Sequence, residues 1–214
     1  APDYETKSSY AVIVEVSDDV HAVQKAIAIE INNLNDNTPV ISSSASFSIN
    51  EGETNVGQVS ATDADGDSIS YSIGGSDASA LTIDSSSGVL TFNSAPDFNT
   101  KSSYSITATA SDGENAADQN ITIDINNVNE NAPTFTSTST FNVDENQTLV
   151  GTVVATDPDG DTITYSVSGN DAFSIDASSG VLTFNTAPDY ENNSGFNVTA
   201  TASDGDYSVN QTIT

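Results

Sequence analysis

The most constraining feature of the sequence is an internal repeat of about 93 residues. The segment Ala1-Pro-Asp-Tyr-Glu5 returns as Ala95-Pro-Asp-Phe-Asn99 and as Ala187-Pro-Asp-Tyr-Glu191, with the aspartates 94 and 92 residues apart. Residues 86–93 likewise match residues 178–185, Ser-Ser-Gly-Val-Leu-Thr-Phe-Asn in both places. Because several segments recur in one fixed order, the chain is predicted to be an array of similar domains.

The repeat predicts three parts. Residues 1–36 correspond to the C-terminal part of one domain, residues 37–130 to a complete domain, and residues 131–214 to a nearly complete one. We therefore expect the sequence to be a piece of a longer protein. The first part supplies only the last strands of a domain, so a neighbouring segment or an exchanged strand is needed to complete it.

Strict alternation of apolar and polar residues predicts β-strands. Residues 104–110 alternate Tyr, Ile, Ala and Ala with Ser and Thr, and residues 10–16 and 196–202 follow the same rule. A period of two directs one face of each strand toward a core. Runs at 46–50, 56–62, 68–73, 80–84, 88–93, 103–111 and 118–126 give about seven strands per domain. The predicted fold class is all-β, with tandem immunoglobulin-like sandwiches.

The charge is strongly negative, with 31 acidic against 3 basic residues and a net charge of −28. Such a chain repels phosphates, so nucleic acids and anionic membrane surfaces are disfavoured as partners. No apolar run approaches the ~18 residues of a membrane span. Two carboxylates ~4 Å apart repel by about 1 kcal/mol in water and about 4 kcal/mol at an effective surface dielectric. Clustered carboxylates therefore need cations.

Acidic and amide residues do cluster, in repeated segments at predicted strand ends and in the connector between domains. In the complete domain and its connector these are Glu51, Asp63, Asp65, Asp67, Asp97, Asp112, Asn127, Asn129, Glu130 and Asn131. Calcium takes six to eight oxygen ligands of these kinds, so the pattern predicts calcium binding. An EF-hand loop is excluded because its sixth position needs Gly and holds Ser68 or Thr162 here. The alternative is that these residues only shape turns.

Nothing in the sequence predicts catalysis. His21 is the only histidine, and it is expected in a solvent-exposed loop beside Asp18 and Asp19. No serine lies in a nucleophile-elbow motif, and neither a phosphate-binding glycine loop nor a zinc-type His/Cys cluster is present. The chain is predicted not to be an enzyme.

The acidic segments together resemble the calcium signatures of the cadherin repeat. They are Asp144-Glu-Asn146, Asp63-Ala-Asp65, Asp189-Tyr-Glu191, Ser111-Asp112 and the connector Asn33-Leu-Asn-Asp-Asn-Thr-Pro39. The resemblance covers essentially the whole chain. It implies Greek-key sandwiches joined by calcium-binding linkers, with ions held between successive domains.

The resemblance also implies which residues bind calcium. The first junction would use Asp3, Glu5, Asn35, Asp36, Asn37, Asp63, Asp65 and Asp112. The second would use Glu51, Asp97, Asn129, Glu130, Asn131, Asp157, Asp159 and Asp204. A junction beyond residue 214 would use Glu145, Asp189 and Glu191. The last aspartates of the two Asp-Gly-Asp loops, Asp67 and Asp161, complete the candidate set.

Some residues depart from the family pattern. The connectors begin with Asn33 and Asn127 where the family prefers Asp, and Asn99 stands where a Glu is expected, which implies weaker binding or fewer ions at the second junction. The short Asp-Gly-Asp loops are more similar to bacterial cadherin-like surface proteins and adhesins than to animal cadherins. His21-Ala-Val23 spells an adhesive tripeptide of animal cadherins, and we interpret it as a chance match.

The predicted function is therefore a calcium-dependent adhesion or spacer module at the cell surface or outside the cell, in which calcium ions stiffen a rod of domains. Its expected partners are calcium, adjacent repeats of the same chain, and either a homotypic protein or a surface polysaccharide. The alternative function is a carbohydrate-binding module of a secreted polysaccharide-degrading enzyme. Exposed aromatic residues would favour that alternative, but Tyr71, Tyr165, Phe92 and Phe184 are predicted to face inward.

Overall fold

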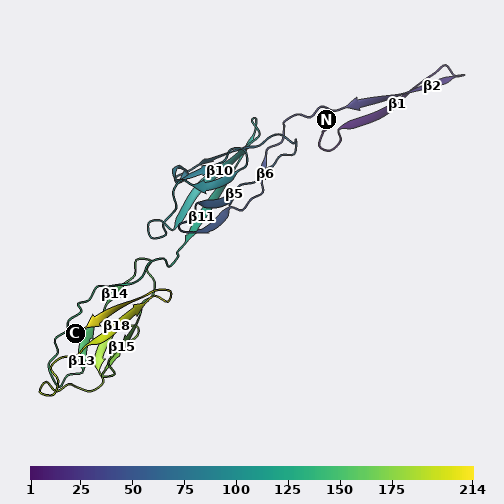
Figure 1. The fold of residues 1–214 in the computed structure, drawn as a ribbon. Coiled ribbons are helices and arrows are strands. Elements are labelled where there is room, and N and C mark those ends of the chain that lie inside the picture. The colour runs from purple at the N-terminus through teal and green to yellow at the C-terminus, as the bar shows by residue number, and fades with distance from the viewer. The chain divides into compact units, whose positions relative to one another are not determined.

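The computed structural model describes all 214 residues, and its regular structure is almost entirely β-strand (Figure 1). The chain divides into two compact units, residues 1–126 and residues 127–214. The predicted all-β fold is confirmed. No helix of the chain is both long enough and apolar enough to span a membrane. The boundaries at 36/37 and 130/131 stay predictions.

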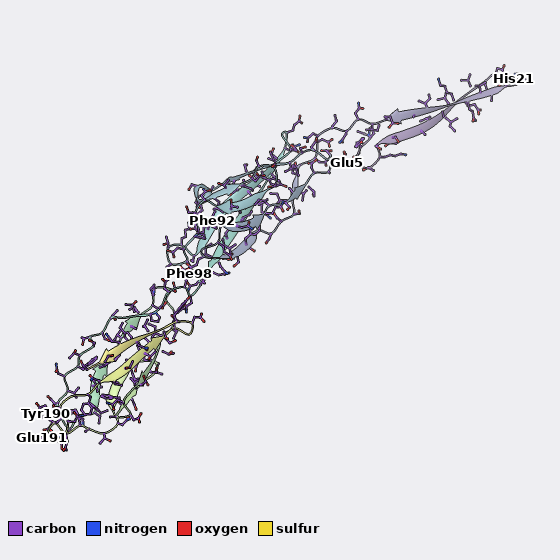
Figure 2. All side chains as sticks on the ribbon, in the orientation of Figure 1. Glu5, His21, Phe92, Phe98, Tyr190 and Glu191 are labelled. Carbon is purple, nitrogen blue, oxygen red and sulfur yellow. The ribbon has the colours of Figure 1, made fainter.

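Unit 1 begins with a β-hairpin. Strand β1 (Ser9–Ser17) pairs antiparallel with β2 (Ala22–Glu30) over their whole length, with Val12 opposite Ile27. A turn at residues 18–21 connects them, and Figure 2 shows His21 at this tip of the hairpin. The side chain of His21 is 82% exposed, as predicted for a loop histidine.

Residues 37–126 form a β-sandwich of nine strands, β3 to β11. One sheet has the order β4 (Ser46–Asn50), β11 (Ala116–Asn126), β10 (Ser103–Ser111) and β7 (Ser70–Gly74). The facing strands are β5 (Asn55–Gln58), β9 (Val89–Phe92) and β8 (Leu81–Ile83), with the short pair β3 (Val40–Ile41) and β6 (Ala61–Thr62). A single 3-10 turn, Ala78–Ala80, precedes β8.

The core of this sandwich comes from the inward faces that the alternation predicts. Ile106 and Ile121 lie opposite each other on β10 and β11, and both are fully buried together with Leu90 of the other sheet. Strand β11 also pairs in parallel with β4, which sets Ile123 beside Phe47. Each strand therefore contributes one apolar face to a single core, while the Ser, Thr and Asn residues of the other face meet solvent.

One repeated glycine is required by close backbone packing. Gly88 has a φ of +73°, and a Cβ atom placed there would lie 2.2 Å from the carbonyl oxygen of Val59. Gly180 repeats the arrangement, with φ +69° and 2.1 Å to the carbonyl oxygen of Val153. Any other residue would be strained and would clash with backbone, which explains why the Ser-Ser-Gly segment recurs.

Unit 2 repeats the sandwich. Its sheets are β15 (Thr164–Ser168), β18 (Val198–Ser203) and β19 (Ser208–Ile213); β13 (Leu149–Thr152), β17 (Val181–Phe184) and β16 (Phe173–Ile175); and the pair β12 (Thr134–Phe135) and β14 (Ala155–Thr156). Phe173, Phe184 and Phe196 pack as a cluster in its core, with ring centroids 4.4 to 5.9 Å apart.

The prediction of one strand over residues 56–62 is wrong. Residues 55–58 belong to β5 and residues 61–62 to β6, and these strands lie in different sheets. Between them Val59 is fully buried and donates its backbone N–H to Gly88, while the carbonyl oxygen of Ser60 accepts from Ser42 and Ser43. Val56 and Val59 are both buried but lie three residues apart, so the two-residue alternation changes phase at this sheet switch.

The prediction that Tyr10, Val12, Val14 and Val16 face a core is also wrong. These side chains do share one face of β1, but Val12 is 45% exposed, Val14 42% and Val16 71%. The equivalent residues of β10 are Ile106, Ala108 and Ala110, and they are buried because the sheet of β5, β8 and β9 covers this face. The hairpin has the same pattern and no opposing sheet.

Candidate calcium-binding loops

In unit 1 the connector is bound to the Asp-Gly-Asp loop by Asp65. The Asp65 carboxylate accepts the backbone N–H groups of Asp36 (3.1 Å) and Asn37 (2.8 Å) and the side-chain amide of Asn37 (2.9 Å). The Asn33 amide donates to the backbone carbonyl of Asp65 at 2.8 Å. Four hydrogen bonds therefore fix the connector against the loop that follows β6.

Unit 2 builds the same arrangement from equivalent residues. The Asp159 carboxylate accepts the backbone N–H groups of Glu130 (3.0 Å) and Asn131 (2.7 Å) and the Asn131 side-chain amide (2.8 Å). The Asn127 amide donates to the Asp159 carbonyl at 3.1 Å. Asp159 is only 5% exposed, so these bonds satisfy a buried carboxylate.

Other aspartates in unit 1 use one oxygen to shape a turn and direct the second toward the candidate site. Asp63 Oδ1 accepts the N–H groups of Asp65 and Asp67, and Asp112 Oδ1 accepts those of Glu114 and Asn115. The Oδ2 atoms of Asp63 and Asp112 are buried and accept no hydrogen bond. A buried charged oxygen without a partner is costly, so these atoms call for a ligand.

Unit 2 has four such atoms. Asp157 Oδ1 and Asp204 Oδ1 are both occupied by backbone N–H groups of their own loops. The buried oxygens that accept no hydrogen bond are Asn129 Oδ1 and the Oδ2 atoms of Asp157, Asp161 and Asp204. All four belong to the predicted set of ligands.

The carboxylates also gather in groups whose oxygens lie within 4.8 Å of one another. Figure 2 labels Glu5 and Glu191, which belong to two of these groups. The groups are Glu5, Asp36 and Asp65; Asp63, Asp65 and Asp67; Asp157, Asp159 and Asp161; and Glu145, Asp189 and Glu191. At this spacing the carboxylates repel one another unless a cation lies among them.

The electrostatics of the loops reflect this crowding. Burial, together with the charges of Asp157 and Asp159, raises the pKa of Asp161. By contrast, the amide of Asn131 lowers the pKa of Asp159, because it donates hydrogen bonds to the ionised form. The loop thus holds one carboxylate by hydrogen bonds and leaves another unfavourably charged.

The Ala-Pro-Asp segments form a separate turn. Asp97 accepts the N–H groups of Asn99 and Thr100 and the Thr100 hydroxyl, and Asp3 makes the same contacts with Glu5 and Thr6. Neither Asp3 nor Asp97 joins a group of three carboxylates within its own unit.

Glu51 and Glu145 contact this turn. Glu51 Oε2 accepts the N–H of Phe98 at 2.9 Å, and Glu145 Oε2 accepts that of Tyr190 at 3.2 Å. The glutamate and the Ala-Pro-Asp segment of one domain therefore lie together at one end of the sandwich.

Two features of the loops were not predicted. Asn33 and Asn127 stand where the family prefers Asp. The side-chain amide of each donates a hydrogen bond to a backbone carbonyl, which an aspartate carboxylate could not do. Asn115 donates to Asn35 Oδ1 and to the Asn37 carbonyl, both at 3.3 Å. The recurrence of Asn at 33 and 127 was a visible signal, whereas Asn115 has no counterpart because unit 2 has Tyr207 there.

The donor set fits calcium. It offers only oxygen ligands, it is rich in carboxylates, and several of its oxygens are buried without a hydrogen-bond donor. Calcium binds carboxylate and amide oxygens in flexible geometry, while typical zinc sites include His or Cys ligands, which these loops lack.

A model of the cadherin domain matches residues 45–126 and residues 139–214. The chain belongs to the cadherin family. Cadherin-23 of Homo sapiens is 31% identical over 163 residues, which cover 72% of this chain, and Protocadherin Fat 2 of Mus musculus is 31% identical over 219 residues, which cover 94%. The matches span 5% of the length of each of these relatives.

Solved cadherin structures have the same fold. The extracellular cadherin domains 3–6 of Protocadherin Gamma B2 match with a TM-score of 0.83 and 24% identity, covering 99% of this chain and 58% of that one. Mouse Cadherin-23 EC22–24 matches with a TM-score of 0.67 and 26% identity, covering 99% and 74%. The chain therefore contains two tandem cadherin domains, which are extracellular or cell-surface domains.

Proposed function

We propose that these cadherin domains form a calcium-stiffened adhesion or spacer segment of a larger surface protein. The observation that carries the proposal is the set of buried Asp and Asn oxygens that accept no hydrogen bond. Six such atoms lie in predicted ligand residues, two in unit 1 and four in unit 2. The relatives are adhesion proteins rather than enzymes, which supports a binding role and not catalysis.

In this proposal calcium supplies positive charge and up to eight coordination positions for oxygen ligands. The chain's own residues do the positioning. Asx turns at Asp63 and Asp112 hold one oxygen each and direct the other inward, and the hydrogen bonds to Asp65 fix the connector beside them. Glu5 adds a carboxylate from the preceding segment, so binding would join the segment before the connector to the domain after it.

Calcium bound only by the ordered connector would stabilise that order by RT ln(1 + [L]/Kd). Extracellular calcium modules have Kd values of about 10⁻⁴ to 10⁻³ M, so ambient calcium would control the stiffness of the connector. The partner of the surface protein is proposed to be a second such protein or a surface polysaccharide. The short Asp-Gly-Asp loops support a relation to bacterial cadherin-like surface proteins.

Calcium titration by isothermal calorimetry tests the proposal. The double variant Asp63→Ala/Asp65→Ala should lose the ions of the first connector and keep those of the second. Small-angle X-ray scattering in millimolar calcium and in excess EDTA should show a stiff particle that becomes flexible on chelation. Equal scattering in both conditions would contradict the stiffening role.

A matched control removes two carboxylates elsewhere. Asp118 and Asp124 are exposed on β11 and accept hydrogen bonds from Thr109 and Ser103. The variant Asp118→Ala/Asp124→Ala changes the net charge by the same amount and should keep the full calcium stoichiometry. If it loses as many ions as Asp63→Ala/Asp65→Ala, the binding depends on overall charge and the assignment of the ligands is wrong.

A further inference from the structure

Each connector, residues 33–39 in unit 1 and residues 127–133 in unit 2, is anchored on the domain that follows it by two kinds of contact. Hydrogen bonds to the Asp-Gly-Asp loop hold its middle. Its last residue is a proline whose side chain is fully buried, Pro39 in one connector and Pro133 in the other. The compact unit 2 likewise includes its connector from Asn127 onward. The connector is therefore structurally a part of the following domain.

The first residue of each connector makes a bond that aspartate, which the family prefers there, could not make. The side-chain amide of Asn127 donates to the backbone carbonyl of Asp159 at 3.1 Å, and that of Asn33 donates to Asp65 at 2.8 Å. An aspartate would place a carboxylate against the carbonyl oxygen, and the two acceptors would repel each other. Asparagine therefore replaces a repulsion by an attraction at the same place in both connectors.

The atoms that hold the connector differ from the atoms that lack a hydrogen-bond donor. In unit 2 the connector is held by backbone N–H groups and side-chain amides that converge on Asp159. The buried oxygens without a donor belong to Asn129, Asp157, Asp161 and Asp204. Because every donor in the first set is an uncharged N–H group, these bonds form without a cation. A cation bound among the second set of oxygens would leave them in place.

We propose that Asn33 and Asn127 are positioning residues that keep each connector docked on the following domain whether or not calcium is bound. Asn35 and Asn129 then present their side-chain oxygens from a backbone that is fixed on both sides. The inference rests on the proposed calcium binding, since only a bound ion uses this placement. Calcium therefore meets a connector that is already ordered, and it has to order only the residues that precede the connector.

Docking in advance affects calcium affinity by a simple relation. When an ion binds only the docked connector, its apparent Kd is the intrinsic Kd divided by the fraction of chains with a docked connector. One hydrogen bond between neutral groups changes such an equilibrium by about 2- to 10-fold. Loss of the Asn127 amide should raise the opening equilibrium of the connector by this factor. Calcium affinity should fall by at most the same factor, because the remaining bonds to Asp159 keep part of the population docked.

Amide hydrogen exchange in excess EDTA, followed by NMR, tests the docked state without calcium. The wild-type amides of Glu130 and Asn131 should exchange at least about tenfold more slowly than those of an unstructured peptide of the same sequence. Asn127→Ala should speed their exchange by about 2- to 10-fold, and Asn127→Asp should speed it at least as much. Wild-type amides that exchange at peptide rates overturn the proposal, and so does equal exchange in the wild type and Asn127→Ala.

A matched control substitutes an asparagine elsewhere in unit 2. Asn210 is exposed on β19 and accepts a hydrogen bond from Thr201 at 2.7 Å. Asn210→Ala and Asn210→Asp make the same chemical changes and should leave the exchange of Glu130 and Asn131 as it is in the wild type. Equally fast exchange in both pairs of variants would mean that unit 2 is destabilised as a whole, which would contradict a specific role of Asn127.

The first connector provides an independent check, because it has a further anchor. The Asn115 amide donates to a side-chain oxygen and to a backbone oxygen of this connector, both at 3.3 Å. Asn33→Ala should speed exchange of the Asp36 and Asn37 amides in EDTA, and adding Asn115→Ala should speed it further. An Asn33→Ala variant that exchanges like the wild type would contradict a shared role at the two connectors.

Calcium titration by calorimetry separates the docked connector from the proposed function. Asn127→Ala should keep the number of bound ions and lower the affinity by at most about tenfold. Loss of an ion would make Asn127 a ligand and would overturn its positioning role. If the wild type binds no calcium while its connector amides are protected in EDTA, the proposed function is wrong and the connector is docked as inferred. If those amides are protected only in calcium, the proposed function stands and the docked connector is wrong.

Discussion

The hairpin β1–β2 and the strand pair β10–β11 are the same sequence element in two environments. Both pair in the same register, with Val12 opposite Ile27 in one and Ile106 opposite Ile121 in the other. Ile121 is fully buried and Ile27 is 42% exposed. The alternation of apolar and polar residues therefore predicts a strand and its apolar face. Whether that face is buried depends on a second sheet, which is formed by other segments of the chain.

The largest expected difference between the two regions is in their rates of amide hydrogen exchange. Amides in β10 and β11 open only when the sandwich unfolds, whereas those of an isolated hairpin open locally. With typical domain stabilities, we expect exchange in β1–β2 to be at least about 1,000 times faster. Mass spectrometry of peptides 103–126 and 9–30 measures both in one sample. Similar rates would show that the hairpin is covered in solution.

A matched substitution at equivalent isoleucines gives the next largest effect. Ile121→Ala removes a fully buried side chain and should lower the free energy of unfolding by about 2–5 kcal/mol. Ile27→Ala should change it by less than about 0.5 kcal/mol, because the side chain is already in contact with water. Urea unfolding followed by circular dichroism compares them. A large effect of Ile27→Ala would contradict the exposed hairpin.

Asp18 and Asp112 compare the turns that follow β1 and β10. Each Oδ1 accepts two backbone N–H groups, but only Asp112 has a buried Oδ2 without a hydrogen bond. Asp112→Asn should weaken calcium binding by about tenfold or more, since even changes outside the ligand shell cost 10–100-fold. Asp18→Asn should leave calcium affinity unchanged in the same calorimetric titration. A loss of calcium affinity in both variants would contradict the assignment of Asp112, but not Asp18, as a calcium ligand.

The pH dependence of Asp18 follows from its turn. The backbone N–H groups of His21 and Val20 lower the pKa of Asp18 below its ordinary value. Its contribution to the turn is therefore present above that value and is lost as the pH falls through the lowered pKa. The carboxyl carbon of Asp18, followed by NMR, should titrate below about 3.9. A midpoint at or above this value would show that the turn does not persist in solution.

Substitutions on the polar faces of the two strand pairs should show the smallest difference in their effect on stability. Gln24 donates to Glu15 and Thr109 donates to Asp118, both at 2.6 Å, at equivalent positions. Cross-strand pairs of this kind contribute about 0.2–1 kcal/mol. Gln24→Ala and Asp118→Ala should therefore both have small effects, measured by exchange of the neighbouring amides in each strand pair. A large difference would show that the second sheet also acts on the outer face.

Much of the fold could be predicted from the sequence because its information is local. The strand β10 and its buried face follow from alternation, and the recurring glycines follow from turns that only glycine permits. The break between β5 and β6 shows in the sequence only as a change of phase: buried Val56 and Val59 lie three residues apart rather than two, and this spacing does not by itself show that the chain moves to another sheet.

The candidate sites divide in the same way. The recurring Asp, Glu and Asn residues identified the loops, and the structure brings most of them into groups of close carboxylates. The sequence did not indicate that Asp65 would accept hydrogen bonds while Asp63 and Asp112 keep a buried oxygen free. That division depends on which backbone N–H groups point at each carboxylate.

By itself, the sequence determined the repeat, the all-β fold, the acidic loops and the apolar face of each strand, because each depends on residue type and spacing along the chain. The tertiary structure decided which of these faces are covered and which oxygens lack a donor. The physical reason is that burial and hydrogen-bond partnership depend on segments distant in the chain. Equal patterns at Ile27 and Ile121 therefore have opposite outcomes.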